Sequence, residues 1–196
     1  MIKRLVDILA SFFGLLFFSP ILLPTIFLIW KEDKRSPFYV RPRLGKNGKS
    51  FKMIKLRSME VDADKSGVVS SSENDTRITP IGHKIRKYKL DELIQLWNVL
   101  IGDMSLVGPR PDVSGYADKL KGEDRKILKL RPGITGTASL KYANEEEILA
   151  AQDDAQKYND EVIFPDKVKV NLEYYENQTI WLDIKIIFAT IFRTSY

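Results

Sequence analysis

The sequence predicts a mostly helical α+β protein with one membrane-inserted segment near its amino terminus. Residues 8–30 form a run of 23 positions without a charge. Residues 36–59 contain short β-prone runs separated by turn signals. Apolar residues recur at helical spacing between residues 81 and 100. The 196 residues are enough for one domain together with a membrane segment.

Composition excludes several kinds of site. The chain has no cysteine and a single histidine, His83, which excludes disulfides, thiolate metal sites and a multi-histidine metal centre within one chain. The formal net charge is +5, from 31 Lys and Arg against 26 Asp and Glu. That surplus suits a membrane surface, a phosphorylated substrate or a nucleic acid. The basic residues are spread along the chain rather than striped, which argues against a nucleic-acid partner.

The uncharged run, Ile8 to Trp30, is the clearest structural signal. A helix of this length is about 35 Å long, enough to cross the hydrocarbon core of a bilayer. Pro20 and Pro24 predict a bend or break near Ser19-Pro20, where the Ser19 hydroxyl could bond a carbonyl that loses its amide partner. Both flanks are basic, and on charge alone a single crossing and a hairpin with both ends in the cytoplasm fit equally well.

The rest of the chain predicts short elements joined by loops. Strands are expected at 38–40 and 51–57 around a turn at 45–48, and a polar loop at 60–79. The other predicted elements are a helix at 81–100, a loop at 102–111, a short helix at 118–129, a turn at 131–136, helices at 144–160 and 167–175, and an amphipathic segment on the membrane surface at 179–192.

Asp91 and Glu92 are the first candidate for chemistry. The basic residues just upstream favour the ionised form of both carboxylates. Two adjacent carboxylates can divide labour, because one can act as a nucleophile while the other holds a hard divalent cation. The alternative is a solvated helix face balanced by lysines, and composition alone favours that alternative.

Three arginines lie beside turn-forming residues: Arg57, Arg110 and Arg131. A guanidinium held by a stiff loop suits bidentate phosphate binding, although for each arginine ordinary surface pairing is the alternative. A rival site is Asp62-Ala-Asp64, a pattern with which many glycosyltransferases hold a metal and a nucleotide sugar. No βαβ pattern or Gly-rich fingerprint accompanies it, so we interpret it as a solvated loop.

Taken together, these segments resemble the bacterial sugar transferase family, the small monotopic polyprenol-phosphate phosphoglycosyl transferases. The resemblance covers nearly the whole chain, and Tyr174-Tyr175 and Trp181-Leu-Asp183 extend it towards the end. The motifs that carry it occur in the same order in the family. They are the apolar segment with Ser19-Pro20, Phe51-Lys-Met-Ile-Lys-Leu-Arg-Ser-Met59, Leu90-Asp-Glu-Leu-Ile-Gln-Leu-Trp-Asn-Val-Leu100, Gly102-Asp-Met-Ser-Leu-Val-Gly-Pro-Arg-Pro111 and Arg131-Pro-Gly-Ile-Thr-Gly136.

The resemblance implies a two-step transfer that begins glycan assembly on a lipid. Asp91 would attack the β-phosphorus of a UDP-sugar, releasing UMP and leaving a covalent phosphosugar. Undecaprenyl phosphate would then accept the sugar phosphate. Glu92, together with Asp91, would hold Mg²⁺. The basic residues that the resemblance and their loop positions assign to substrate phosphates are Lys55, Arg57, Arg86, Arg110 and Arg131.

The resemblance also implies where the chain lies. UDP-sugars are cytoplasmic, so residues 36–196 are expected to form a cytoplasmic catalytic domain, with a small β-hairpin or sheet around the active site. Residues 1–35 are expected to form a re-entrant helix broken at Ser19-Pro20. This describes the minimal catalytic unit of a monotopic protein on the cytoplasmic face of the bacterial inner membrane. Membrane lipids are expected partners, and a homodimer is left open.

The chain departs from the family pattern after Gly136. Many members carry an arginine where this chain has Ala143, so a contact assigned to that arginine is in doubt, and Lys141 could replace its charge but not its fork geometry. A second hypothesis is a non-enzymatic membrane-surface module whose basic face binds anionic lipid. It explains the charge and the apolar segment but not the joint occurrence of the other motifs.

Overall fold

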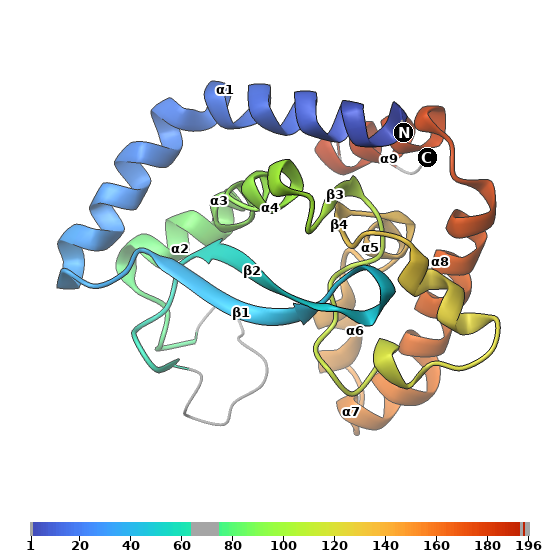
Figure 1. Ribbon diagram of the computed structural model, residues 1–196. Helices are drawn as coiled ribbons and strands as arrows, with labels where there is room; N and C mark the ends of the chain where they lie inside the picture. Colours follow the sequence, from blue (N-terminus) through green and yellow to red (C-terminus); the bar gives the residue numbers. More distant parts are fainter. Residues whose placement is uncertain (1, 64–74, 193, 195–196) are drawn as a thin grey trace.

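The computed structural model describes residues 2–63, 75–192 and 194, and its described part is mostly helical with two small sheets (Figure 1). The helices are α1 Ile2–Asp33, α2 Pro80–Lys87, α3 Leu90–Leu93, α4 Leu96–Ile101, α5 Thr137–Lys141, α6 Glu145–Ala150, α7 Ala155–Tyr158, α8 Phe164–Asn177 and α9 Ile180–Phe192. The strands are β1 Phe38–Leu44, β2 Ser50–Leu56, β3 Ser105–Val107 and β4 Gly133–Thr135. Short 3-10 helices cover Lys46–Gly48, Ala117–Lys119 and Asp124–Lys129, and Asn159–Ile163 is π-helical.

Helix α1 is unbroken, although its axis bends as it arches over the rest of the molecule (Figure 1). The predicted break at Ser19-Pro20 is therefore wrong, whereas the predicted bend is present. Ser19 Oγ donates to the Leu16 carbonyl at 2.7 Å, and this is the carbonyl that an amide at position 20 would otherwise have bonded. The side-chain bond replaces the missing donor, so the helix continues through the proline. By length and composition α1 could cross a membrane, and most of its apolar side chains are exposed.

Both ends of α1 are attached to the rest of the chain. At the amino end, Asp7 is buried and accepts hydrogen bonds from Ser105 Oγ at 2.9 Å and from the Leu106 amide at 3.1 Å. At the carboxyl end, Asp33 receives a two-pronged contact from the buried Arg57, at 2.6 and 2.7 Å. Leu22 and Ile29 of α1 pack with Leu56 and Ile85 in a buried cluster.

The predicted hairpin is confirmed. Strands β1 and β2 pair antiparallel from Phe38 opposite Leu56 to Leu44 opposite Ser50. Asn98 of α4 has no exposed surface; its Nδ2 donates to the Lys52 carbonyl at 2.8 Å and its Oδ1 accepts from the Ile54 amide at 3.1 Å. One side chain thus attaches β2 to α4, and it fixes the position of the following residues of β2 relative to α4.

The continuous helix predicted for residues 81–100 is wrong, because α2, α3 and α4 occupy this stretch. Lys89 has φ +52°, a left-handed conformation that ends α2 and begins the short α3. The helix predicted for 118–129 is also wrong: two 3-10 helices stand there, with Gly122 at φ +56° between them. The helix predicted for 144–160 is divided into α6, α7 and the π-helical turn. The helix predicted for 167–175 is confirmed as part of α8, and most of the segment 179–192 forms the helix α9.

Residues 131–136 are not only a turn, since β4 pairs in parallel with β3, Ser105 opposite Gly133 and Val107 opposite Thr135. The two backbones approach closely beside this pair. A Cβ on Gly108 would lie 2.2 Å from the Arg131 carbonyl oxygen, and one on Gly136 would lie 2.2 Å from the Gly108 carbonyl oxygen. Glycine is required at both positions, which explains why the two Gly-containing motifs occur together.

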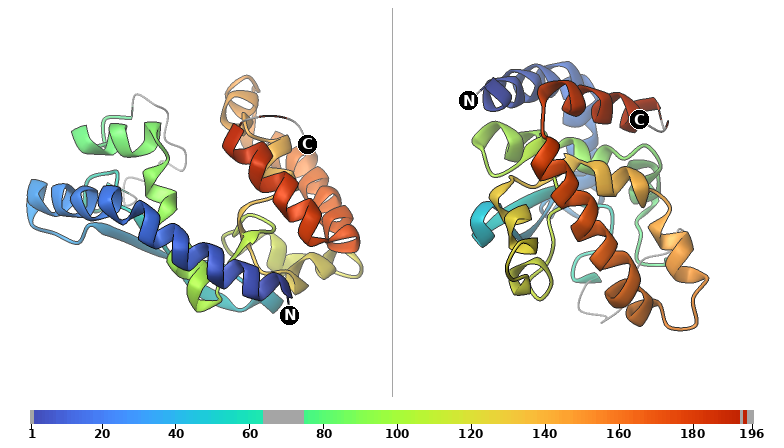
Figure 2. Two further views of the ribbon diagram at one scale, coloured as in Figure 1. Left: turned by 90° about the horizontal axis from the view of Figure 1, so that it is seen from above. Right: turned by 90° about the vertical axis from the view of Figure 1, so that its right-hand side faces the viewer.

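Helix α9 lies on the same side of the molecule as α1 (Figures 1 and 2). It has large exposed apolar side chains, with 68% of Trp181 and 65% of Ile191 accessible. On α1, 76% of Phe17 is accessible. This side of the protein is therefore far more apolar than an ordinary soluble surface.

Candidate active site

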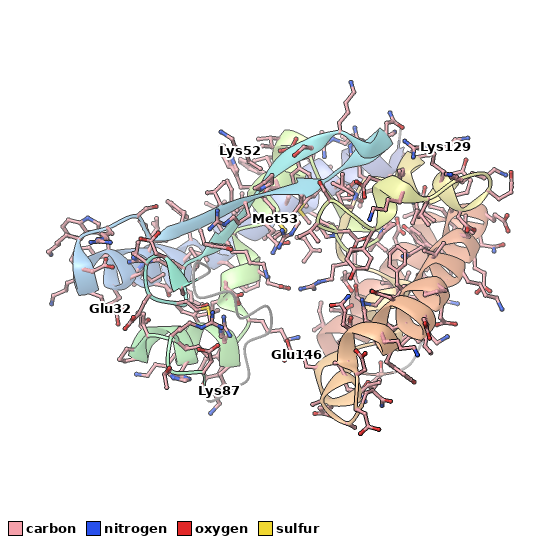
Figure 3. All side chains as sticks on the ribbon, turned by 90° about the horizontal axis from the view of Figure 1, so that it is seen from below. Glu32, Lys52, Met53, Lys87, Lys129 and Glu146 are labelled. Carbon is pink, nitrogen blue, oxygen red and sulfur yellow. The ribbon has the colours of Figure 1, made fainter. Side chains whose placement is uncertain are left out.

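Asp91 and Glu92 lie in α3, on the wall of a large open cavity of about 3560 Å³. One wall comes from the β1–β2 hairpin and α2–α4, and the other from the segment that contains α5–α8. Figure 3 looks into this region from below, with Met53 and Lys87 on one side and Glu146 on the other. The left-handed residue Lys89 begins the short helix α3, and this helix carries both carboxylates to the cavity wall.

Three predicted basic residues surround the carboxylates from three different elements. Lys55 of β2 lies between them, with its Nζ 2.8 Å from Glu92 Oε1 and 3.9 Å from Asp91 Oδ2. Arg110, which follows β3, brings Nη2 to 3.6 Å from the same Glu92 oxygen. Arg86 of α2 donates from Nε to Ser58 Oγ at 2.9 Å, and its charge also lowers the pKa of Asp91.

The two neighbouring carboxyl groups have opposite pKa shifts. Burial raises the pKa of Asp91 above its ordinary value; the charge of Lys55 opposes this, and that of Glu92 adds to it. Burial would also raise the pKa of Glu92, but the charges of Lys55 and Arg110, with the Lys55 hydrogen bond, outweigh it and lower that pKa. The site therefore holds one firmly ionised carboxylate beside one that is poorly solvated and more basic.

Arg57 and Arg131 have partners other than the two carboxylates, although Arg57 also lines the cavity. Both terminal nitrogens of Arg57 bind Asp33, so this arginine fastens α1 and its fork is not open to a phosphate. Arg131 does not line the cavity; its Nε donates to the Gly102 carbonyl at 2.8 Å, beside a separate small hollow. Of the five predicted phosphate ligands, Lys55, Arg86 and Arg110 are the ones gathered at the carboxylates.

Other cavity residues were not predicted from the sequence. Burial raises the pKa of Asp112 to about 6, against the lowering charges of Lys167 and Arg110. The sequence offered one signal for Asp112 as a cavity residue, which is that it directly follows the Pro-Arg-Pro motif. Lys141, considered above as a replacement for an arginine at position 143, is paired with Asp166 at 2.6 Å.

The carboxylates suit a magnesium ion that also binds substrate. Among the described residues no group of three or more His, Cys, Asp or Glu side chains could form a metal cage. Mg²⁺ is commonly held by one or two carboxylates with water and substrate phosphates rather than by an all-protein cage. Asp91 and Glu92 supply that donor set. For the rival pair, Asp62 adopts a left-handed turn with φ +68°, and Asp64 lies outside the described residues.

Comparison with known proteins shows the family of the chain. The family model described as "Bacterial sugar transferase" matches residues 1–195. The chain is 35% identical over 193 residues to a UDP-N-acetylgalactosamine-undecaprenyl-phosphate N-acetylgalactosaminephosphotransferase of Aeromonas hydrophila, covering 97% of this chain and 43% of the relative. It is 34% identical over 195 residues to a UDP-glucose:undecaprenyl-phosphate glucose-1-phosphate transferase of Klebsiella pneumoniae, covering 97% and 39%.

An undecaprenyl-phosphate glucose phosphotransferase of Komagataeibacter xylinus is 40% identical over 199 residues, covering 97% of this chain and 35% of the relative. The chain thus spans about two-fifths of the length of these relatives. Their names share the lipid acceptor; the Aeromonas relative is named for N-acetylgalactosamine and the other two for glucose.

Proposed function

The chain belongs to the bacterial sugar transferase family, and we propose that it transfers a sugar-1-phosphate from a UDP-sugar to undecaprenyl phosphate, the first membrane step of glycan assembly in bacteria. The observation that carries this proposal is the pair Asp91 and Glu92, surrounded by Lys55, Arg86 and Arg110 in one open cavity. Phosphoryl transfer depends mainly on positioning and charge neutralisation, and this arrangement offers both.

In the first step, an Asp91 carboxylate oxygen attacks the β-phosphorus of the UDP-sugar. The bond between that phosphorus and the bridging oxygen breaks, UMP leaves with the electron pair, and the sugar phosphate stays on Asp91 as an acyl phosphate. Burial favours this role, since a poorly solvated carboxylate with a raised pKa is a better nucleophile. Lys55 and Arg110 would neutralise the diphosphate charge.

In the second step, a phosphate oxygen of undecaprenyl phosphate attacks the same phosphorus. The bond to Asp91 breaks, the carboxylate is regenerated, and the lipid diphosphate sugar leaves. A covalent intermediate lets a soluble donor and a lipid acceptor use one site in turn. Glu92, with Asp91, would hold Mg²⁺, which when bound supplies further positive charge against the phosphates. Glu92 stays ionised for this because Lys55 and Arg110 hold its pKa low.

The two attachments of α1 support a monotopic arrangement. Asp7 at one end and Asp33 at the other both bind the body that carries the active site. A helix that crossed the bilayer would place these ends on opposite faces. Residues 1–35 therefore form a re-entrant membrane helix in this proposal, and residues 36–196 form a catalytic domain on the cytoplasmic face, where UDP-sugars are found.

The deciding experiment measures UMP release by purified protein with a panel of UDP-sugars, undecaprenyl phosphate and Mg²⁺. At least one donor should give UMP, and Asp91→Asn should abolish release from all of them, at least 1,000-fold, because the amide cannot form the acyl phosphate. Asp153→Asn, at an exposed aspartate, is the matched control and should stay active.

Turnover at the wild-type rate in Asp91→Asn would overturn the mechanism. Protein that binds vesicles of anionic lipid but releases no UMP from any donor would instead favour a membrane-surface module.

A further inference from the structure

A second basic site lies apart from the catalytic cavity, at the amino end of α1. It is a small hollow of about 150 Å³. The residues lining it are Lys3, Arg4, Asp7, Lys46, Ser105, Lys129, Leu130, Arg131 and Gln178. None of these residues lines the catalytic cavity except Leu130, so the two sites are distinct.

Positive charge in this hollow is not balanced by the protein. Its lining has five cationic side chains, and the carboxylates at hand are Asp7 in the lining and Asp183, which binds Lys3 at 2.6 Å. That leaves an excess of three positive charges. Within the described chain, no salt bridge is found for Lys46, Lys129 or Arg131. Such an excess in a confined space favours an anionic ligand.

Several contacts hold the hollow in shape. Arg4 donates to the carbonyls of Val99 and Leu100, and Arg131 donates to that of Gly102, so both arginines are fixed at the end of α4. Lys3 Nζ also donates to the Val107 carbonyl at 3.1 Å. Three of the five cations are therefore held in place by the fold, while Lys46 and Lys129 are exposed to solvent.

The position of the hollow identifies the anion. Ile2 and Leu5 of α1 are 67% and 57% exposed, and Trp181 on α9 is 68% exposed close to Asp183. Apolar side chains with an exposed tryptophan mark the boundary between water and lipid. Basic residues at that boundary attract the phosphates of anionic lipids. We propose that this hollow binds the phosphate headgroup of an anionic bilayer lipid and so holds the amino end of α1 at the membrane surface.

The test uses short-chain lipids as probes with the purified full-length chain. Dioctanoyl-phosphatidylglycerol should raise the melting temperature, and dioctanoyl-phosphatidylcholine at equal concentration should not, because a ligand stabilises the folded state that binds it. The double variant Lys46→Gln with Lys129→Gln should need about 25-fold more phosphatidylglycerol for the same effect, the product of roughly five-fold for each lysine.

The control is Lys121→Gln with Lys157→Gln, which removes the same charge at exposed lysines outside the hollow and should respond like wild type. Asp91→Asn should also respond like wild type, which separates this site from the catalytic one whatever becomes of the proposed function.

An unchanged response in the Lys46 and Lys129 variant, confirmed as folded by its melting temperature in phosphatidylcholine, would overturn the proposal. Equal stabilisation by inorganic phosphate would also overturn it, since the site would then bind free anions. Lys129→Arg, which keeps the charge, should retain the lipid response if the variant with glutamine loses it.

Discussion

Asp91 and Glu92 are adjacent in sequence, but their surroundings give them different chemistry. Lys55 lies 2.8 Å from Glu92 and 3.9 Å from Asp91, so the stronger ion pair belongs to Glu92. Burial then dominates at Asp91 and raises its pKa, while the cations dominate at Glu92 and lower its pKa. Carboxyl groups whose pKa values are pushed apart commonly have separate roles, and in the proposed mechanism these are a nucleophile and a charge-holding partner.

The charge of Lys55 should determine the pH at which the proposed UMP release begins. UMP release requires ionised Asp91, so its rate should rise with pH as Asp91 loses its proton. The charge of Lys55 lowers the pKa of Asp91, so its loss in Lys55→Met should raise that pKa and move the rise to higher pH. Activity at neutral pH should fall roughly 100-fold. Lys55→Arg keeps the charge and should keep the position of the rise. A rise at the wild-type pH in Lys55→Met would contradict this assignment.

Asp112 should cost the protein stability at neutral pH. Its folded pKa, raised by burial to about 6, exceeds the ordinary value of 3.8 for an aspartate, so folding disfavours the ionised form. The stability present below about pH 4 is lost as pH rises through 6. Asp112→Asn should therefore be more stable than wild type at pH 7.5, by up to about 3 kcal/mol, and equal to it near pH 4. Denaturant unfolding at both pH values measures this, and an equal gain at both would exclude ionisation as the cause.

At the residue scale, sequence reasoning singled out the two carboxylates that line the cavity, but it could not tell which arginine lies beside them. Arg57, Arg110 and Arg131 all lie beside turn-forming residues, yet only Arg110 approaches the Asp91 and Glu92 pair. Which way a side chain leaves its loop depends on tertiary partners such as Asp33 and the Gly102 carbonyl. Those partners are 24 and 29 residues away in the chain, beyond the reach of local pattern.

At the scale of elements, apolar periodicity predicted where helices bury a face but not where they stop. The helical spacing of apolar residues continues across Lys89, from Ile85 to Leu93, although the backbone at Lys89 is left-handed. The parallel pairing of β3 with β4 was equally hidden, because three-residue strands carry too little alternation to be recognised. The glycines did mark it, since Gly108 and Gly136 are needed where the two backbones meet.

The attachment of α1 through Asp7 should be a measurable part of stability. Asp7→Leu leaves Ser105 Oγ and the Leu106 amide buried without their acceptor, which should cost about 2–4 kcal/mol and lower the melting temperature by roughly 4–12 °C. Ser11→Ala is the matched control: Ser11 is equally buried on α1, but its hydroxyl bonds only the Ile8 carbonyl within the same helix. Equal losses in both variants would show that the attachment adds nothing.

For the whole molecule, the apolar helix α1 is attached to the elements that carry the active-site residues. The amino end of α1 binds β3, which leads to Arg110, and its carboxyl end binds Arg57 just beyond β2, the strand that carries Lys55. Helices α1 and α9 lie on the same side of the molecule (Figure 2), and both have large exposed apolar side chains. The sequence predicted the membrane segment by length, but the contacts that attach both its ends became visible only in three dimensions.

These contacts lead to a prediction about topology. Because α1 is attached at both ends to one domain, residues 2 and 32 should lie on the same, cytoplasmic face. The chain has no cysteine, so Ile2→Cys and Glu32→Cys each give a single label site at an exposed position. A membrane-impermeant maleimide should label both variants in inside-out vesicles and neither in intact spheroplasts. Labelling of Ile2→Cys in spheroplasts, with Glu32→Cys protected there, would establish a spanning helix, and the contacts of Asp7 with Ser105 could not then exist in the membrane.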